Sequence, residues 1–209
     1  MYLPASFCED DLNNQLALLR ANPLGLIISQ SPQGLLADPV PFLVDEQQGQ
    51  VILRAHLSRA NPHWQVLQAG QECLVVFQGA EGYISPGWYE TKRQTGKVVP
   101  TWNYATVQMW GIPKVIEEAS WLRQQLTGLT ALHEGKQPQP WHLEDAPAGY
   151  IAANMKGIIG IEIAVTRREG KWKMSQNRTA ADVDGVIAGL RAGDAAQQQL
   201  ADEVERRRG

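Results

Sequence analysis

Short apolar segments separated by turns constrain the fold of this chain most strongly. Four such segments occur in its first eighty residues, at 24–29, 35–44, 50–56 and 72–78. Apolar runs of this length, bounded by turn residues, predict β-strands. A single short helix, beginning at Pro62, interrupts them. Because the connections are too short for crossover helices, we expect a mainly β protein with flanking helices, built as an antiparallel barrel or sandwich.

The second half of the chain predicts more helix. Residues 117–156 form a helical segment in this interpretation, and residues 179–209 form a helical tail. Thr179 and Asp182 resemble a capping box at the start of that tail. The length allows one large domain or two small ones, and we expect a single domain over residues 1–209.

Proline, glycine and basic residues mark three local features. Pro39 and Pro41 remove ladder donors, which predicts an edge strand or a bulged strand. Residues 111–113 are expected to bend a strand, and residues 168–170 to form a turn. The basic residues between two aromatic segments predict a flexible loop; they are Lys92, Arg93 and Lys97.

Composition excludes several classes of protein. The net charge of −3 provides no global attraction for nucleic acid or an anionic membrane. Cys8 and Cys73 are far apart and form no CxxC motif, which favours reduced thiols and a cytoplasmic location. Residues 1–6 lack the features of a signal peptide, and no apolar run is long enough to span a membrane.

Tryptophan is unusually frequent, with seven residues against five tyrosines and three phenylalanines. Tryptophan is enriched at interfaces and ring-binding sites. This raises the odds of a planar ligand or a dimer interface, although core packing is the commoner role of any single tryptophan.

The segment 54–64 is the first candidate for a binding site. Ser58 and Arg59 follow an apolar strand, and Asn61 with Pro62 predicts a helix start. A hydroxyl, a guanidinium and free N–H groups at a helix N-terminus can bind a phosphate. A capped helix with its arginine in a salt bridge is the alternative.

Two later segments could complete a site for an aromatic ring. The residues that could wall a heterocycle are Trp88, Tyr89, Trp102, Asn103 and Tyr104. Residues 173–177 carry a lysine and amide groups that could meet its polar edge, or they could form only a helix-entry turn. Together these parts suit an anionic aromatic cofactor such as flavin mononucleotide (FMN). No P-loop, GxGxxG motif, nucleophile elbow or zinc-binding spacing is present.

Five sequence blocks carry a family resemblance. They are MYLPASF at 1–7, HLSRANPHW at 56–64, FQGAEGYISPGWY at 77–89, VPTWNY at 99–104 and KMSQNR at 173–178. In this order and spacing they resemble the PaiB family of FMN-binding negative transcriptional regulators, up to about Leu190. The resemblance implies an FMN-binding split β-barrel, a homodimer with flavin at the subunit interface, and repression of protease production and sporulation.

The resemblance also implies a set of cofactor contacts. Residues 51–59 are similar, more distantly, to the phosphate-binding strand of pyridoxamine-phosphate oxidases. A basic residue usually follows the arginine there, and Ala60 stands in that place. One phosphate contact is therefore missing, or replaced by Asn61. The expected FMN-binding residues are Arg54, His56, Ser58, Arg59, Asn61, Trp102, Asn103, Tyr104, Lys173, Ser175, Gln176 and Asn177.

Three functional hypotheses follow. The first is a flavin-sensing regulator that does not turn over a substrate, the second a flavin-dependent oxidoreductase, and the third a dimeric barrel without flavin. No catalytic acid or base is evident, and His56 and Tyr104 are the residues to test. The basic groups Arg167, Arg168, Lys171, Arg178 and 206–208 predict at most a weak DNA contact.

Overall fold

The computed structural model describes residues 1–208 and groups the chain into two compact units. Unit 1 comprises residues 1–18, 78–107 and the chain from residue 169 onward. Unit 2 comprises residues 19–77 and 108–168. Each unit is described by itself below.

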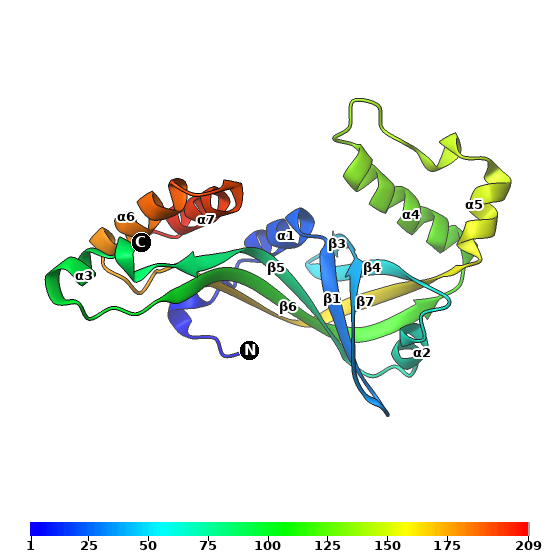
Figure 1. Ribbon diagram of the computed structural model, residues 1–209. Coiled ribbons are helices and arrows are strands. Elements are labelled where there is room, and N and C mark those ends of the chain that lie inside the picture. Colours follow the sequence, from blue (N-terminus) through cyan, green and yellow to red (C-terminus); the bar gives the residue numbers. More distant parts are fainter. Residues whose placement is uncertain (209) are drawn as a thin grey trace. The chain divides into compact units, whose positions relative to one another are not determined.

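A seven-stranded sheet dominates the fold, and its order is β2-β1-β5-β6-β7-β4-β3 (Figure 1). The β1–β2, β1–β5, β3–β4 and β4–β7 pairs are antiparallel, which confirms the predicted antiparallel, mainly β class. The strands are β1 Leu24–Ser31, β2 Gly34–Pro41, β3 Leu43–Gln47, β4 Gln50–Ser58, β5 Cys73–Ile84, β6 Thr101–Ile116 and β7 Ile158–Lys173.

Helices flank the strands. The longest is α4 (Ala119–Glu134), so the prediction of a helical segment after residue 117 is confirmed. None of the helices within residues 1–208 is long and apolar enough to cross a membrane. The other helices are α1 Leu12–Ala21, α2 His63–Gln68, α3 Glu90–Thr95, α5 Ala148–Met155, α6 Ala180–Arg191 and α7 Ala195–Arg206, with short 3-10 turns η1 Ala5–Phe7, η2 Pro86–Trp88 and η3 Leu143–Asp145.

The prolines of β2 lie on an edge strand, as predicted. β2 and β3 are the two edges of the sheet, and the chain passes from one to the other at Phe42. The Phe42 ring is fully buried and meets Phe77 edge to face, with ring centroids 5.6 Å apart. On an edge strand, a proline can be placed so that its missing N–H would face the unpaired side of the sheet.

The alternation of β4 places two polar side chains under α4 in unit 2. Leu53 and Ala55 are buried in the core, while Arg54 and His56 point to the opposite face of the strand. On β7, Gly160 pairs with His56, and a Cβ at this glycine would lie 2.4 Å from the Trp121 ring of α4. The missing side chain thus lets α4 pack closely over this face.

The C-terminal tail of unit 1 is helical, as predicted. Figure 1 shows α6 and α7 side by side, and Leu190, Leu200 and Val204 are fully buried. The Thr179 side chain accepts a hydrogen bond from the Asp182 N–H at 3.3 Å and caps α6. This cap confirms one half of the predicted capping box.

Three local predictions are wrong. β6 and β7 continue without a bend at 111–113 or a turn at 168–170. A Cβ at Gly111 would lie 2.4 Å from the Ala164 carbonyl oxygen, and one at Gly170 would lie 2.6 Å from the Glu9 carbonyl oxygen. These glycines therefore permit close backbone approach. The supposed basic loop contains helix α3, which ends at Gly96 in a left-handed conformation.

Candidate functional site

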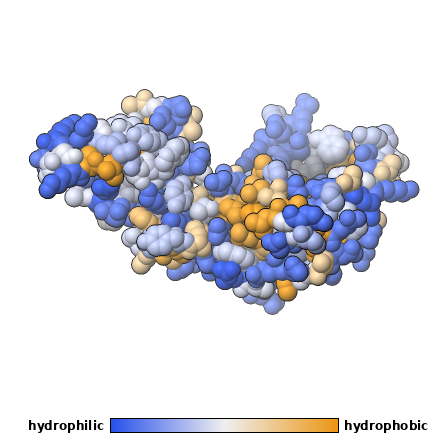
Figure 2. Space-filling view, turned by 60° about the horizontal axis from the view of Figure 1, so that its bottom comes forward, coloured by the Kyte–Doolittle hydropathy of each residue, from blue (hydrophilic) through white to orange (hydrophobic). Residues whose placement is uncertain are grey.

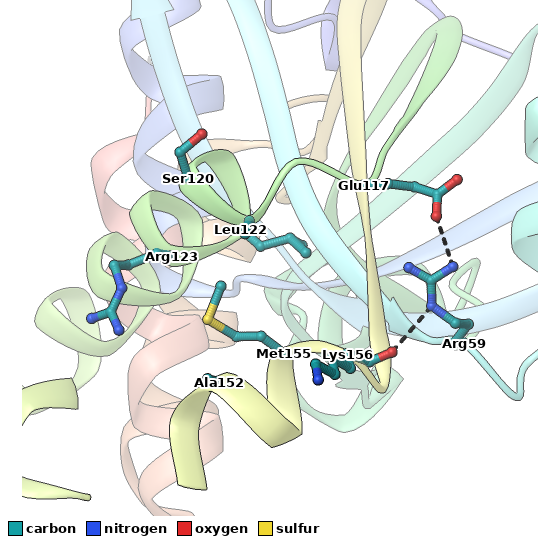
Figure 3. Close-up of a pocket in the computed structure, with 9 residues that line it drawn as sticks. Arg59, Glu117, Ser120, Leu122, Arg123, Ala152, Met155 and Lys156 are labelled. Carbon is teal, nitrogen blue, oxygen red and sulfur yellow. Dashed lines mark hydrogen bonds and ion pairs between the residues drawn. The ribbon is translucent and has the colours of Figure 1, made fainter. Parts of the chain in front are cut away.

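Arg59, which follows β4, lies where three segments of unit 2 meet (Figure 3). Its Nε donates a hydrogen bond to the Lys156 carbonyl oxygen at 3.2 Å, and its NH1 donates to Glu117 Oε2 at 2.8 Å. The backbone N–H of Arg59 also donates to the Gly157 carbonyl at 2.8 Å. Arg59 therefore forms the salt bridge that the sequence analysis gave as the alternative to phosphate binding. This ion pair fixes the direction of the guanidinium.

A cavity of about 530 Å³ adjoins this ion pair. Three cationic side chains and a single carboxylate line it, so the lining has an excess of positive charge. Apolar atoms from α4 and α5 form the rest of the wall (Figure 3). The lining residues are Arg59, Glu117, Ala119, Ser120, Leu122, Arg123, Ala152, Met155 and Lys156.

The N-terminus of α4 opens into this cavity. α4 has 16 residues, and its N-cap Glu118 makes no side-chain hydrogen bond to the first turn. Ala119 and Ser120 belong to that turn and line the cavity. The first N–H groups of a helix have no partners within the helix, and its dipole favours an anion there. Combined with Arg59 and Lys156, this arrangement fits a phosphate group.

Glu117 places a carboxylate beside this site. Its side chain is 60% exposed and that of Arg59 is 38% exposed, so solvent screens their attraction. An incoming anion would therefore compete with a weakly held carboxylate for the guanidinium.

The other predicted site residues on β4 also have partners of their own. Arg54 Nε donates to Glu162 Oε2 at 3.0 Å, and its NH1 donates to Asp45. His56 Nδ1 lies 2.9 Å from Gln125 Oε1. These contacts hold Arg54 and His56 under α4.

Ser58 and Asn61 shape the turn after β4. Ser58 is exposed, and its hydroxyl accepts a hydrogen bond from the Ala60 N–H at 3.3 Å. Asn61 Oδ1 accepts the His63 N–H at 2.9 Å, so the predicted start of α2 is confirmed. The Asn61 amide donates to Asp38 Oδ2 at 3.1 Å, which places a carboxylate beside this residue. The helix N-terminus that accompanies Arg59 in the cavity is therefore that of α4.

The remaining predicted site residues belong to unit 1. The Asn103 amide donates to the Ser175 hydroxyl at 2.9 Å, and both side chains are buried. Ser175 adopts a φ of 65°, a left-handed conformation that is uncommon outside glycine. This buried pair fixes the turn after β7. The Lys173 ammonium donates to the Trp102 carbonyl at 2.6 Å, and burial lowers the pKa of Lys173.

The amide of Gln176 is also engaged within unit 1. Its oxygen accepts the Met174 N–H and its nitrogen donates to the Trp172 carbonyl, each at 2.6 Å. Asn177 is exposed, and so is Trp102, of which 53% is accessible. Tyr104 is half-buried beside it in the strand. Trp102 and Tyr104 are thus the predicted ring-binding residues with accessible aromatic surface.

Sequence reasoning missed the cavity residues outside the strand. Glu117, Arg123 and Lys156 are distant from Arg59 in the chain, and no motif connects them. The available signal in the sequence is the helical segment predicted to begin at residue 117.

The fold is a split β-barrel. Its solved neighbours include the FAD and heme binding protein from Mycobacterium smegmatis, with a TM-score of 0.54 and 14% sequence identity. That alignment covers 79% of this chain and 73% of the other. At this identity the likeness concerns the fold alone, and the predicted split β-barrel is confirmed.

The chain belongs to the family described as "Putative FMN-binding domain", whose model matches residues 1–167. It is 35% identical to an uncharacterized protein of Emericella nidulans, over 91% of this chain and 90% of that one. It is 28% identical to the protease synthase and sporulation protein PAI 2 of Bacillus subtilis, over 91% and 89%. The PaiB resemblance is confirmed, and FMN is the cofactor of this family.

Proposed function

We propose that this chain is an FMN-binding regulator of the PaiB type that acts as a homodimer. The observation that carries the proposal is the cationic cavity at Arg59 in a chain of an FMN-binding family. The name of the Bacillus subtilis relative supports a role in controlling protease synthesis and sporulation. Repression of transcription is part of this proposal.

The residues of the cavity suit the phosphate of FMN. Arg59, Lys156 and the first turn of α4 would hold the phosphate, and Arg123 would add to the positive potential. When bound, FMN supplies a redox-active isoalloxazine ring that absorbs visible light. The chain's own contribution is to bind and orient the phosphate.

Titration of the apo protein with FMN, followed by flavin fluorescence, tests this assignment. Arg59→Ala should weaken FMN binding about tenfold to hundredfold, because hydrogen bonds to charged groups contribute about 1.5–3 kcal/mol. Binding of riboflavin, which lacks the phosphate, should change little. Glu117→Gln should tighten FMN binding, since it removes the competing carboxylate.

Arg191→Ala is the matched control, because Arg191 also pairs with a carboxylate, Glu205, and lies outside the cavity. This variant should bind FMN as the wild type does. Equal FMN affinity for wild type and Arg59→Ala would refute the phosphate assignment.

We also propose that Trp102 and Tyr104 contact the flavin ring. Their exposed aromatic surface supports this role. Trp102→Ala should then weaken FMN and riboflavin alike, in contrast to Arg59→Ala. Tyr2→Ala is the control, since Tyr2 is 84% exposed and lies outside the predicted ring-binding residues. Unchanged affinity for both flavins in Trp102→Ala would exclude this contact. For the other predicted residues the flavin contact remains part of the proposal.

An apolar face of unit 2 supports the homodimer. Leu24, Leu26 and Leu35 are 63%, 38% and 73% exposed, and Leu26 pairs with Pro39 on β2 and with Val76 on β5. Figure 2 shows one face of the molecule with a gathering of apolar residues. Such patches commonly mark protein interfaces.

Light scattering tests the dimer. Leu26→Glu should convert it to a monomer at micromolar concentration, because a charge would be buried in the contact. Val99→Glu is the control, since Val99 is 65% exposed but lies in unit 1. A wild type that is monomeric at this concentration would exclude the homodimer.

Any direct DNA contact is proposed to be weak and sensitive to salt. The C-terminal arginines 206, 207 and 208 pair with Glu203, Glu9 and Asp184, which balances their charge. Tight, sequence-selective binding in moderate salt would contradict this. A visible spectrum separates regulator from oxidoreductase: bound flavin that resists NADH supports the sensor, and flavin bleached by NADH supports the enzyme.

A further inference from the structure

A second cavity of unit 2 lies beside α4 and has a different chemical character. Its volume is about 350 Å³, and its walls come from α4, η3, α5 and the strands β4 and β7. It shares only Met155 with the lining of the Arg59 cavity. The lining residues are His56, Leu126, Thr130, Trp141, Leu143, Tyr150, Ile151, Asn154, Met155 and Ile158.

This lining favours an uncharged aromatic ligand. It contains no Lys, Arg, Asp or Glu side chain, so nothing in it neutralises an ionised ligand. Trp141 and Tyr150 are 43% and 63% exposed, which is high for large aromatic residues that border an apolar cavity. Pockets for small molecules combine such apolar walls with a few placed polar groups.

His56 is the placed polar group. Its Nδ1 lies 2.9 Å from Gln125 Oε1, and since a carbonyl oxygen can only accept, the ring carries its proton on Nδ1. With the proton on Nδ1, the His56 Nε2 can accept a hydrogen bond, and no protein partner for it is present within residues 1–208. A ligand that donates an O–H or N–H would satisfy it.

The other end of the same Gln125 amide lacks a hydrogen-bond partner within residues 1–208. The residue is 2% exposed, and its Nε2 is a buried side-chain atom without a hydrogen-bond partner in the described chain. Buried polar groups without partners are rare in folded proteins, and those that occur often accompany a functional site or a bound molecule. This one belongs to the side chain that orients His56.

We propose that this cavity binds a small uncharged aromatic molecule with one hydrogen-bond donor, of the phenol or indole class. The donor is bound by His56 Nε2, and the ring lies against the apolar wall beneath Trp141 and Tyr150. The volume, near the lower end of the range of about 300–1,000 Å³ for ligand pockets, suits one or two rings. The proposal assigns His56, one of the predicted flavin contacts, to a different ligand, and it does not depend on the phosphate site at Arg59.

Phenol and anisole are a matched pair of probes, because anisole has a similar ring and no donor. In a ligand-detected NMR titration of the apo protein, phenol should bind about threefold to tenfold more tightly than anisole. In protein labelled at histidine, phenol should shift the Nε2 signal of His56 and leave the other three histidines unchanged.

Two variants separate the cavity from general surface binding. Thr130→Phe fills the cavity and should abolish binding of both probes, while Thr127→Phe adds the same ring to an exposed position of α4 and should bind normally. His56→Phe should bind phenol and anisole equally. Non-saturable binding in the wild type, or equal phenol affinity in Thr130→Phe and Thr127→Phe, would overturn the proposal.

Discussion

Replacing His63 by leucine should destabilise unit 2 more than the same replacement of an exposed histidine. His63 is 1% exposed; its Nε2 lies 2.7 Å from the Ser29 hydroxyl and its Nδ1 lies 2.7 Å from Asp38 Oδ2. Leucine would leave the buried Ser29 hydroxyl without this partner, at about 1–3 kcal/mol, and would remove a charge-assisted bond of about 1.5–3 kcal/mol. Added apolar burial offsets part of this, so we expect a loss of about 2–5 kcal/mol.

Urea unfolding measures the loss. With a slope of about 2–3 kcal/mol per molar urea, the midpoint should fall by about 1–2 M. His133→Leu is the control, because His133 is exposed near the end of α4. The double variant Ser29→Ala with His63→Leu should lose less than the sum of the single variants, since no hydroxyl is then left unpaired. Equal midpoints for His63→Leu and His133→Leu would refute the reasoning.

The same network predicts an acid dependence. Hydrogen bonds from Asn61, and next from His63, lower the pKa of Asp38 below its ordinary value. A lowered pKa in the folded state means that the stabilisation is present above the ordinary aspartate pKa and is lost as the pH falls through the folded-state pKa. Asp38→Asn should therefore flatten the dependence of the urea midpoint on pH below about 4. An unchanged slope would contradict this assignment.

Three further predictions concern packing. Gly189→Ala should destabilise the chain by about 1–3 kcal/mol in thermal melts, because the new Cβ would lie 2.4 Å from the Trp88 ring. Gly149→Ala is the control: its new Cβ would have no atom within 4 Å, so this variant should be neutral or stabilising. Burial raises the pKa of Cys73 to about 12, so iodoacetamide at pH 8 should modify it only after unfolding. Fluorescence and circular dichroism should report a single unfolding transition, because β5, β6 and β7 each have residues in both units, and separate midpoints would contradict one domain.

Local sequence signals predicted most of the helices and strands, but they did not predict contacts between residues far apart in the chain. The alternation in β4 and the capping threonine before α6 depend on neighbours in the chain, so their patterns are visible in the sequence. Gly111 and Gly170 were misread because a glycine permits either a turn or a close backbone approach. The sequence alone does not show which of these the fold requires.

The candidate site was only half predictable for the same reason. Arg59 was identified from the strand end that precedes it, yet its partner Glu117 is 58 residues away. Asn103 and Ser175 form a buried hydrogen bond although they are 72 residues apart, and the sequence does not show their mutual burial. Which polar group faces a cavity and which faces another side chain depends on tertiary packing.

The alanine at position 60 now has a structural context. Related phosphate sites carry a second cation directly after the arginine, and this chain has none there. The Arg59 cavity instead receives Lys156 from the end of α5 and Arg123 from α4. A cation from a distant segment can meet a phosphate as well as one from the strand, because the attraction depends on distance and exposure and not on chain order.

Lys156→Ala should therefore weaken FMN binding about threefold to tenfold while riboflavin binding stays constant, as expected for one exposed cation near a phosphate. Lys136→Ala is the matched control, since Lys136 is also exposed but lies in the linker after α4. If both lysine variants bind FMN as the wild type does, the helical segment does not replace the missing cation, and Arg59 would have to hold the phosphate with the α4 N-terminus alone.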